Sequence, residues 1–96
     1  MYLIELTYVA PIEEIDALIP AHIAWLDQHY AAGHFLASGR KVPRSGGIIL
    51  AARMDRAALD GIIAADPFQQ RGVARVTVTE FEASKAAAGL EGLLGR

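Results

Sequence analysis

A histidine and an aspartate are the side chains of this sequence most able to do chemistry. The chain has three histidines and no cysteine, so proton transfer by histidine is the reaction within closest reach at neutral pH. His22 lies inside an amphipathic stretch, and Asp66 begins the motif Asp66-Pro67-Phe68. A carboxylate bound to an imidazole holds one tautomer and stabilises the protonated ring. The two residues together suggest a pair for general acid–base chemistry.

Both residues also have an ordinary structural interpretation. On a helical wheel His22 lies about 60° from the centre of the apolar stripe, where a half-buried histidine bonded to a backbone carbonyl is the commoner outcome. An aspartate before proline is a normal turn starter whose side chain accepts hydrogen bonds from the amides that follow. From the residues alone, these structural roles are favoured for His22 and for Asp66.

The other histidines are weaker candidates. His29 lies two helical turns beyond His22, roughly 10 Å along the axis, and zinc–nitrogen bonds are only about 2.1 Å long. His34 follows a glycine, and the sequence shows no convincing third ligand. We therefore expect no metal, and we assign Trp25 and Tyr30 to packing or to contacts between subunits.

A third candidate site is the segment 38–47, which is rich in cations and glycine. Arg40, Lys41 and Arg44 lie close together there, and such a loop can clamp a carboxylate or phosphate. A solvated hairpin turn explains the same residues equally well. The glycines do not lead from a strand into a helix at nucleotide-binding spacing, so we expect no Walker or dinucleotide site.

The elements that must position these residues follow from the hydrophobic pattern. β-Branched and aromatic runs predict strands over residues 2–9, 34–40, 48–53 and 73–82. Apolar residues at helical spacing predict one helix that begins at Pro11, kinks or restarts at Pro20 and ends at a left-handed Gly33. A second helix is predicted over 56–65, with Asp55 as its N-cap, followed by a tight turn at Asp66.

This order of elements, β-α-β-β-α-β, is typical of the α+β class and of the ferredoxin-like split βαβ arrangement. Both helices should then cover one face of a four-stranded antiparallel sheet. Residues 1–82 would form the domain, and residues 83–96 a weakly helical or flexible C-terminal tail.

The third predicted strand is apolar on both of its faces. Ile48, Leu50 and Ala52 point one way, and Ile49 and Ala51 point the other. A sheet with one solvated face normally shows polar residues on that face. A 96-residue chain with 53% hydrophobic residues also has more apolar material than one small core hides comfortably. We therefore expect a homodimer packed through the helix-free sheet face.

Composition argues against several other functions. The formal net charge is −2 and the basic residues are dispersed, which argues against nucleic-acid binding. The absence of cysteine removes disulfides and thiolate chemistry. The N-terminus lacks the basic start of a signal peptide, and no apolar run approaches the ~20 residues of a membrane span. We expect a cytoplasmic protein that does not contact membranes.

Short motifs over about residues 2–82 resemble the YciI-like (YCII-related) family. They are Pro20-Ala21-His22-Ile23-Ala24-Trp25-Leu26, Ala32-Gly33-His34-Phe35-Leu36-Ala37-Ser38-Gly39, Ala65-Asp66-Pro67-Phe68 and Val78-Thr79-Glu80-Phe81. The resemblance implies a dimeric α+β barrel type of domain with a catalytic histidine–aspartate pair, which would be His22 and Asp66 here.

The resemblance also bears on the surroundings of that pair. Ser38 and Gly39 match the family's small-residue strand end near the pocket. One branch of the family resembles dehydrochlorinases that act on chlorinated hydroxyquinones. This chain has Gly39-Arg40 where a common pattern has Gly-Pro, and its basic Pro-Arg loop looks like that of another branch. The substrate is therefore not carried over.

Two functions follow as hypotheses. In the first, a small cofactor-free enzyme, His22 moves a proton in an isomerisation, an elimination such as dehydrochlorination, or a hydrolysis. Asp66 orients it, Arg40 or Arg44 holds a small anionic substrate, and Phe68 lines the pocket together with Tyr8 and Phe35. In the second, the same pocket belongs to a non-catalytic dimeric module that binds a metabolite or regulates a partner. A cofactor-free oxygenase is a third reading without specific support in the sequence.

Overall fold

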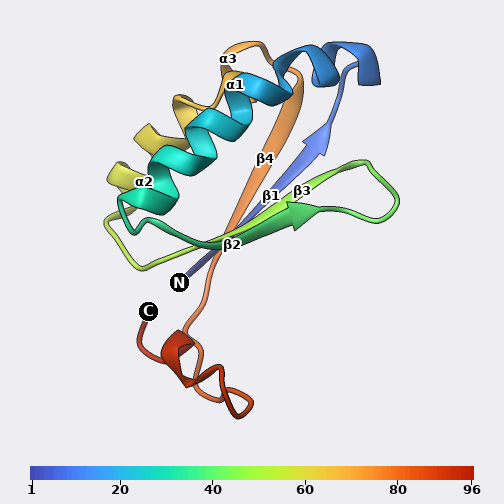
Figure 1. Ribbon diagram of the computed structural model, residues 1–96. Coiled ribbons are helices and arrows are strands. Elements are labelled where there is room, and N and C mark those ends of the chain that lie inside the picture. Colours follow the sequence, from blue (N-terminus) through green and yellow to red (C-terminus); the bar gives the residue numbers. More distant parts are fainter.

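The computed structural model describes residues 1–96 as one sheet with a layer of helices (Figure 1). The elements are β1 (Tyr2–Tyr8), α1 (Ile12–Ala31), β2 (Phe35–Arg40), β3 (Gly46–Ala51), α2 (Arg56–Ala64), α3 (Pro67–Gln70) and β4 (Ala74–Glu80), followed by a 3-10 turn, η1 (Glu91–Leu93). The predicted order of strands and long helices is confirmed. The short helix α3 replaces the simple turn expected at Asp66.

The sheet has four strands in the order β2-β3-β1-β4. All neighbours are antiparallel, and Leu3 in the centre of the sheet pairs with Leu50 on one side and Thr79 on the other. The predicted antiparallel sheet of the α+β class is therefore confirmed. The helices lie together on one side of it (Figure 1).

The core lies between that helix layer and the sheet. Along β1 the residues Tyr2, Ile4 and Leu6 are buried, whereas the alternating residues are only half-buried, because successive side chains of a strand point to opposite faces. From α1 the buried residues include Ile15 and Trp25. Two histidines of α1 share this buried face, and their placement is the basis of the sites described below.

Helix α1 runs without interruption from Ile12 to Ala31 although Pro20 lies inside it. The predicted restart is therefore not observed. Pro20 is exposed, while Ile15 and His22 on either side of it are buried, so packing of both flanking turns against one core offsets the lost backbone hydrogen bond. Gly33 follows the helix with a φ of 80°, as predicted for a left-handed position after a helix end.

The two aspartates predicted to start elements behave differently. Asp55 occupies the N-cap position of α2, but its side chain makes no capping hydrogen bond. Asp66 does cap a helix, α3, by accepting a hydrogen bond from the backbone N–H of Phe68. A proline at the first position of α3 supports this start, because its missing N–H is not needed there.

The C-terminal segment 83–96 forms no α-helix and contains only the turn η1. It extends away from the helix layer (Figure 1) and is joined to the domain through the backbone, where Arg53 N–H donates to the carbonyl of Arg96 at 3.1 Å. No helix of the structure combines the length and the apolar character that crossing a bilayer requires.

Candidate active site

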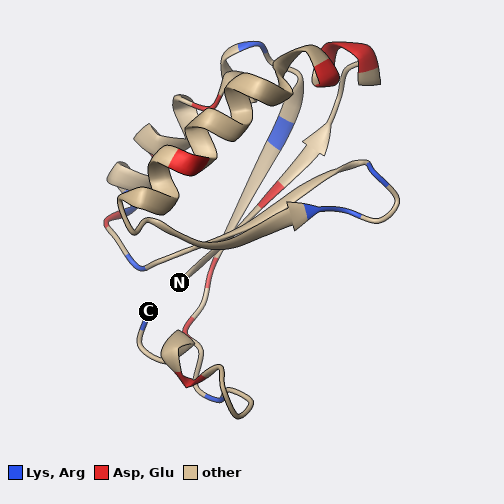
Figure 2. Cartoon of the chain, in the orientation of Figure 1, with Lys and Arg blue, Asp and Glu red and all other residues tan.

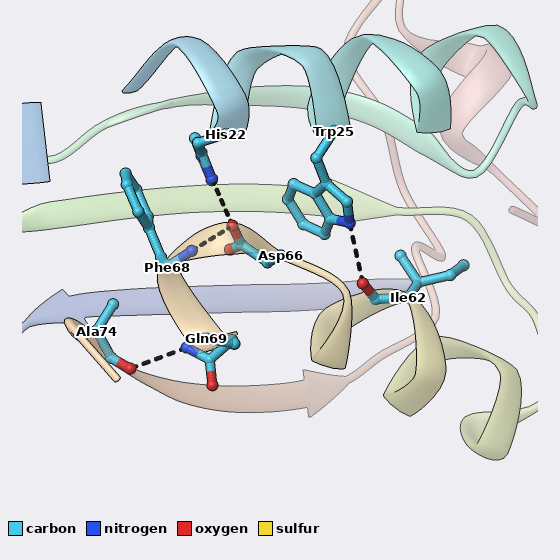
Figure 3. A network of polar contacts seen from close by, with 7 residues as sticks. All are labelled: His22, Trp25, Ile62, Asp66, Phe68, Gln69 and Ala74. Atoms are coloured by element: carbon cyan, nitrogen blue, oxygen red, sulfur yellow. Dashed lines mark hydrogen bonds and ion pairs between the residues drawn. The ribbon is translucent and has the colours of Figure 1, made fainter. Parts of the chain in front are cut away.

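His22 and Asp66 meet inside the helix layer. The Nδ1 atom of His22 lies 2.8 Å from Oδ1 of Asp66, and Figure 3 shows this contact as a dashed line. The two residues are 8% and 0% exposed. An ionised carboxylate can only accept hydrogen bonds, so Nδ1 carries the proton. The other ring nitrogen, Nε2, makes no hydrogen bond within the chain, and in the neutral imidazole it is the nitrogen with the free lone pair. That is the arrangement of a general base.

The backbone around Asp66 holds its carboxylate in place independently of His22. Oδ1 accepts a hydrogen bond of 3.0 Å from Phe68 N–H, and the side-chain amide of Gln69 donates to the carbonyl of Ala74 at 2.8 Å (Figure 3). Helix α3 is thereby fixed both to its cap and to β4. The capping role and the histidine contact therefore coexist, and both fall on Oδ1, while Oδ2 is buried without a hydrogen-bond partner.

Aromatic rings hold the imidazole in its plane. The His22 ring stacks on Phe68 with centroids 4.0 Å apart and an angle of 9° between the planes. Trp25, one turn further along α1, lies at 5.4 Å from the same ring. Its indole N–H donates to the carbonyl of Ile62 at 3.0 Å (Figure 3). The Asp66 hydrogen bond and these ring contacts leave the imidazole little freedom to turn.

A cavity of about 310 Å³ opens beside this histidine, between α1 and the sheet. His22, Ser38, Gly39, Arg40 and Phe68 all line it, so five of the residues singled out in the sequence come together here. The remaining lining is mainly apolar, from α1, β1 and β3, and includes Tyr8, one of the predicted walls. Phe35, the other predicted wall, is instead buried in the core, at 5.2 Å from Trp25.

The three cations of the β2–β3 segment make different contacts. Figure 2 shows them at the outer end of the hairpin, with acidic residues at the start of α1. Lys41 forms an ion pair of 2.9 Å with Glu5 on β1, and Arg44 forms one of 2.6 Å with Asp16 on α1. The hydrogen bond to Asp16 raises the pKa of Arg44 above its usual value. Arg40 makes no ion pair and lines the cavity. Arg44, in contrast, is paired with Asp16 and does not line the cavity.

The remaining two histidines form a second pair that the sequence analysis did not identify. Nδ1 of His29 lies 3.0 Å from Nδ1 of His34, because the left-handed turn at Gly33 brings the start of β2 back against the end of α1. Burial, and secondly the neighbouring His34, lower the pKa of His29. No cluster of three or more His, Asp or Glu side chains in the structure could ligate a metal ion.

Tyr30 is another residue whose contacts exceed the packing role expected for it. Its ring packs edge-on against Phe35 at 6.0 Å, and its hydroxyl donates to Oγ of Ser38 at 2.6 Å. The contact joins the last turn of α1 to the cavity wall. The two residues are eight positions apart in the sequence and lie in different elements, so no helical or strand periodicity signals the contact.

Comparisons with known proteins agree with this fold. No curated protein matches the chain. A solved structure of 5-chloro-2-hydroxyhydroquinone dehydrochlorinase (TftG) from Burkholderia phenoliruptrix AC1100, in complex with 2,5-dihydroxybenzoquinone, has a TM-score of 0.73 and 14% sequence identity, covering 88% of this chain and 96% of that one. At this identity the similarity concerns the fold alone. The family model of the YCII-related domain matches residues 1–82, and the chain therefore belongs to the YCII-related domain family.

Proposed function

We propose that this protein is a small cofactor-free enzyme in which His22 and Asp66 transfer a proton to and from a small anionic substrate. The observation that carries the proposal is the 2.8 Å contact between His22 Nδ1 and Asp66 Oδ1 beside a cavity that His22 itself lines. Asp66 holds the tautomer whose Nε2 lone pair accepts a proton, and its negative charge stabilises the imidazolium that results.

The reaction class is isomerisation, elimination or hydrolysis. In an elimination, Nε2 takes a proton from the substrate while the released electron pair moves through the substrate and expels an anion such as chloride. The imidazolium then gives its proton to water. The substrate has thus lost one proton and one anion, which together make one molecule of hydrogen chloride when the anion is chloride. Arg40, Ser38 and the backbone at Gly39 would bind the negative charge of the substrate, and the apolar walls, Phe68 among them, strengthen those interactions by excluding water.

The test uses 5-chloro-2-hydroxyhydroquinone, the compound that appears in the name of the structurally similar dehydrochlorinase. Chloride release from 5-chloro-2-hydroxyhydroquinone is measured for the wild type, His22→Gln, Asp66→Asn and the control His34→Gln, which changes a histidine outside the cavity. Loss of a general base lowers such rates by about 10²–10⁴-fold. The His22 variant should lose activity on that order, and the His34 variant should keep it. Full activity in a folded His22→Gln protein would rule the proposal out.

A non-catalytic binding module is the second candidate. The cavity holds few nucleophilic side chains, since Ser38 and Tyr8 are its only hydroxyl-bearing residues, and this favours binding without turnover. Saturable binding of 2,5-dihydroxybenzoquinone with no chloride release from the chlorinated compound would support the module. Binding together with release that depends on His22 would support the enzyme.

We further propose that the domain is a ferredoxin-like, dimeric α+β barrel type of protein, with the helix-free sheet face as the homodimer contact. Leu3, Ile48 and Leu50 lie together on that face, as the strand register places them, and each is only half-buried within one chain. Apolar side chains in such a position favour a second copy as cover. The cytoplasmic location and the lack of membrane and nucleic-acid partners stay predictions of the sequence.

A further inference from the structure

We infer that Tyr30 is a positioning residue of the cavity, which turns the Ser38 hydroxyl into a hydrogen-bond donor for an anionic ligand. The role rests on the proposed function, because it concerns the same cavity. Tyr30 does not itself line that cavity, whereas Ser38 does. Tyr30 therefore acts through Ser38.

A serine hydroxyl has one proton to donate and two lone pairs that accept hydrogen bonds. Tyr30 donates to Ser38 Oγ at 2.6 Å, so one lone pair of Ser38 is occupied and its own proton points elsewhere. Ser38 donates to no group of the chain. A hydroxyl that accepts one hydrogen bond also becomes a better donor in the next. The Ser38 proton is thus available to a ligand in the cavity.

The strand register places a cation beside this donor. Alternate residues of a strand share one face, so Ser38 and Arg40 lie on the same side of β2. Ser38 pairs with Ile49, which is buried against the helices. Both residues therefore face the helix side of the sheet, where they line the cavity. Arg40 is also the cation of its segment that no carboxylate neutralises.

This arrangement specifies the chemical class of the ligand. One edge of the cavity, from β2, offers the Ser38 hydroxyl and the Arg40 guanidinium to an anionic oxygen. The helix side offers His22 Nε2 to a proton. A small planar acid with an ionised oxygen at one end and a transferable proton at another fits both. Enolates, phenolates and hydroxyquinones of one ring have that pattern.

The experiment compares an anionic and a neutral ring of similar size. 2,5-Dihydroxybenzoquinone is a vinylogous acid that is ionised at pH 7, and hydroquinone is uncharged. Dissociation constants for both are measured by NMR titration with the wild type, Tyr30→Phe, Ser38→Ala and Tyr2→Phe. The Tyr2 variant is the matched control, since that hydroxyl donates to the carbonyl of Met54 at 2.9 Å and lies outside the cavity lining.

Tyr30→Phe keeps the ring that packs on Phe35 and removes only the hydroxyl. We expect it to weaken binding of the anionic quinone by about threefold to tenfold, the range of one neutral hydrogen bond. Ser38→Ala should weaken it by at least about tenfold, because the lost bond is to a charged group. Binding of hydroquinone should be unchanged in Tyr30→Phe, and Tyr2→Phe should match the wild type for both rings.

The possible outcomes distinguish a failure of the Tyr30 role from a failure of the proposed anion site. Wild-type affinity for the quinone in Tyr30→Phe would overturn the positioning role and leave the proposed site standing. An equal loss for both rings in Tyr30→Phe would show that Tyr30 is merely structural, which also overturns the role. If the wild type binds neither ring, the anion site of the proposed function fails and the role of Tyr30 fails with it.

Discussion

One oxygen of Asp66 holds both the start of helix α3 and the ring of His22. Oδ1 accepts from Phe68 N–H at 3.0 Å and from His22 Nδ1 at 2.8 Å, in a residue with no exposed surface. Substitution of Asp66 should therefore disturb local folding and the orientation of the imidazole together.

Asp66→Asn should lower the free energy of unfolding by about 1–3 kcal/mol, the cost of weakening buried hydrogen bonds that involve a charged group. Denaturation in urea measures the change. Asp55→Asn is the matched control, because Asp55 also precedes a helix but makes no capping hydrogen bond; its effect should stay within about 0.5 kcal/mol. Equal effects of the two substitutions would contradict the double role of Asp66.

Acidification should destabilise the fold through His29. Burial, followed by the nearby His34, lowers the folded-state pKa of His29 below its ordinary value of 6.5. As pH falls, the unfolded chain takes up the proton before the folded chain does, so this contribution to stability is complete above pH 6.5 and is lost as pH falls toward the folded pKa. An NMR titration of the His29 ring should give a midpoint below 6.5.

The same titration of His34→Gln separates the two causes. Removing the charge of His34 should move the His29 midpoint upward only in part, because burial is the larger cause. A midpoint at or above 6.5 in the wild type would show that His29 is not shielded from solvent as the structure has it.

Gly46 should tolerate no side chain, whereas Gly61 should accept one. A Cβ atom on Gly46 would collide with the backbone carbonyl of Leu6 in the paired strand, so Gly46→Ala should cost about 2 kcal/mol or more through displacement of β3. Nothing lies within 4 Å of a Cβ on Gly61, in helix α2. Gly61→Ala should therefore stabilise by roughly 0.5–1 kcal/mol. Thermal unfolding of both variants measures the contrast.

Leu50→Lys should convert the proposed homodimer to a monomer. The substitution would place a charge on the half-buried helix-free face, where desolvation in a dimer contact is costly. Light scattering at micromolar concentration gives the mass. Val42→Lys serves as the control, because Val42 lies in the β2–β3 loop and is 95% exposed, and its mass should equal that of the wild type. A monomeric wild type would refute the homodimer.

The sequence by itself determined the elements and their order. Alternation along β1 and helical spacing along α1 predicted those elements to within a residue or two, because these patterns are local and reflect which face of an element is buried. The capping by Asp66 is local as well. The residues alone favoured separate structural roles for His22 and Asp66. The family resemblance added the prediction that the two form a pair.

Only the tertiary structure decided which residues share the cavity. Arg40 and Arg44 are equivalent in the sequence, yet α1 carries Asp16 past the loop and pairs it with Arg44, which leaves Arg40 for the cavity. The chain reversal after α1 likewise brings Tyr30 to Ser38 and His29 to His34. Such contacts depend on how the helix is seated on the sheet, and this follows from the packing of the whole core rather than from any local pattern.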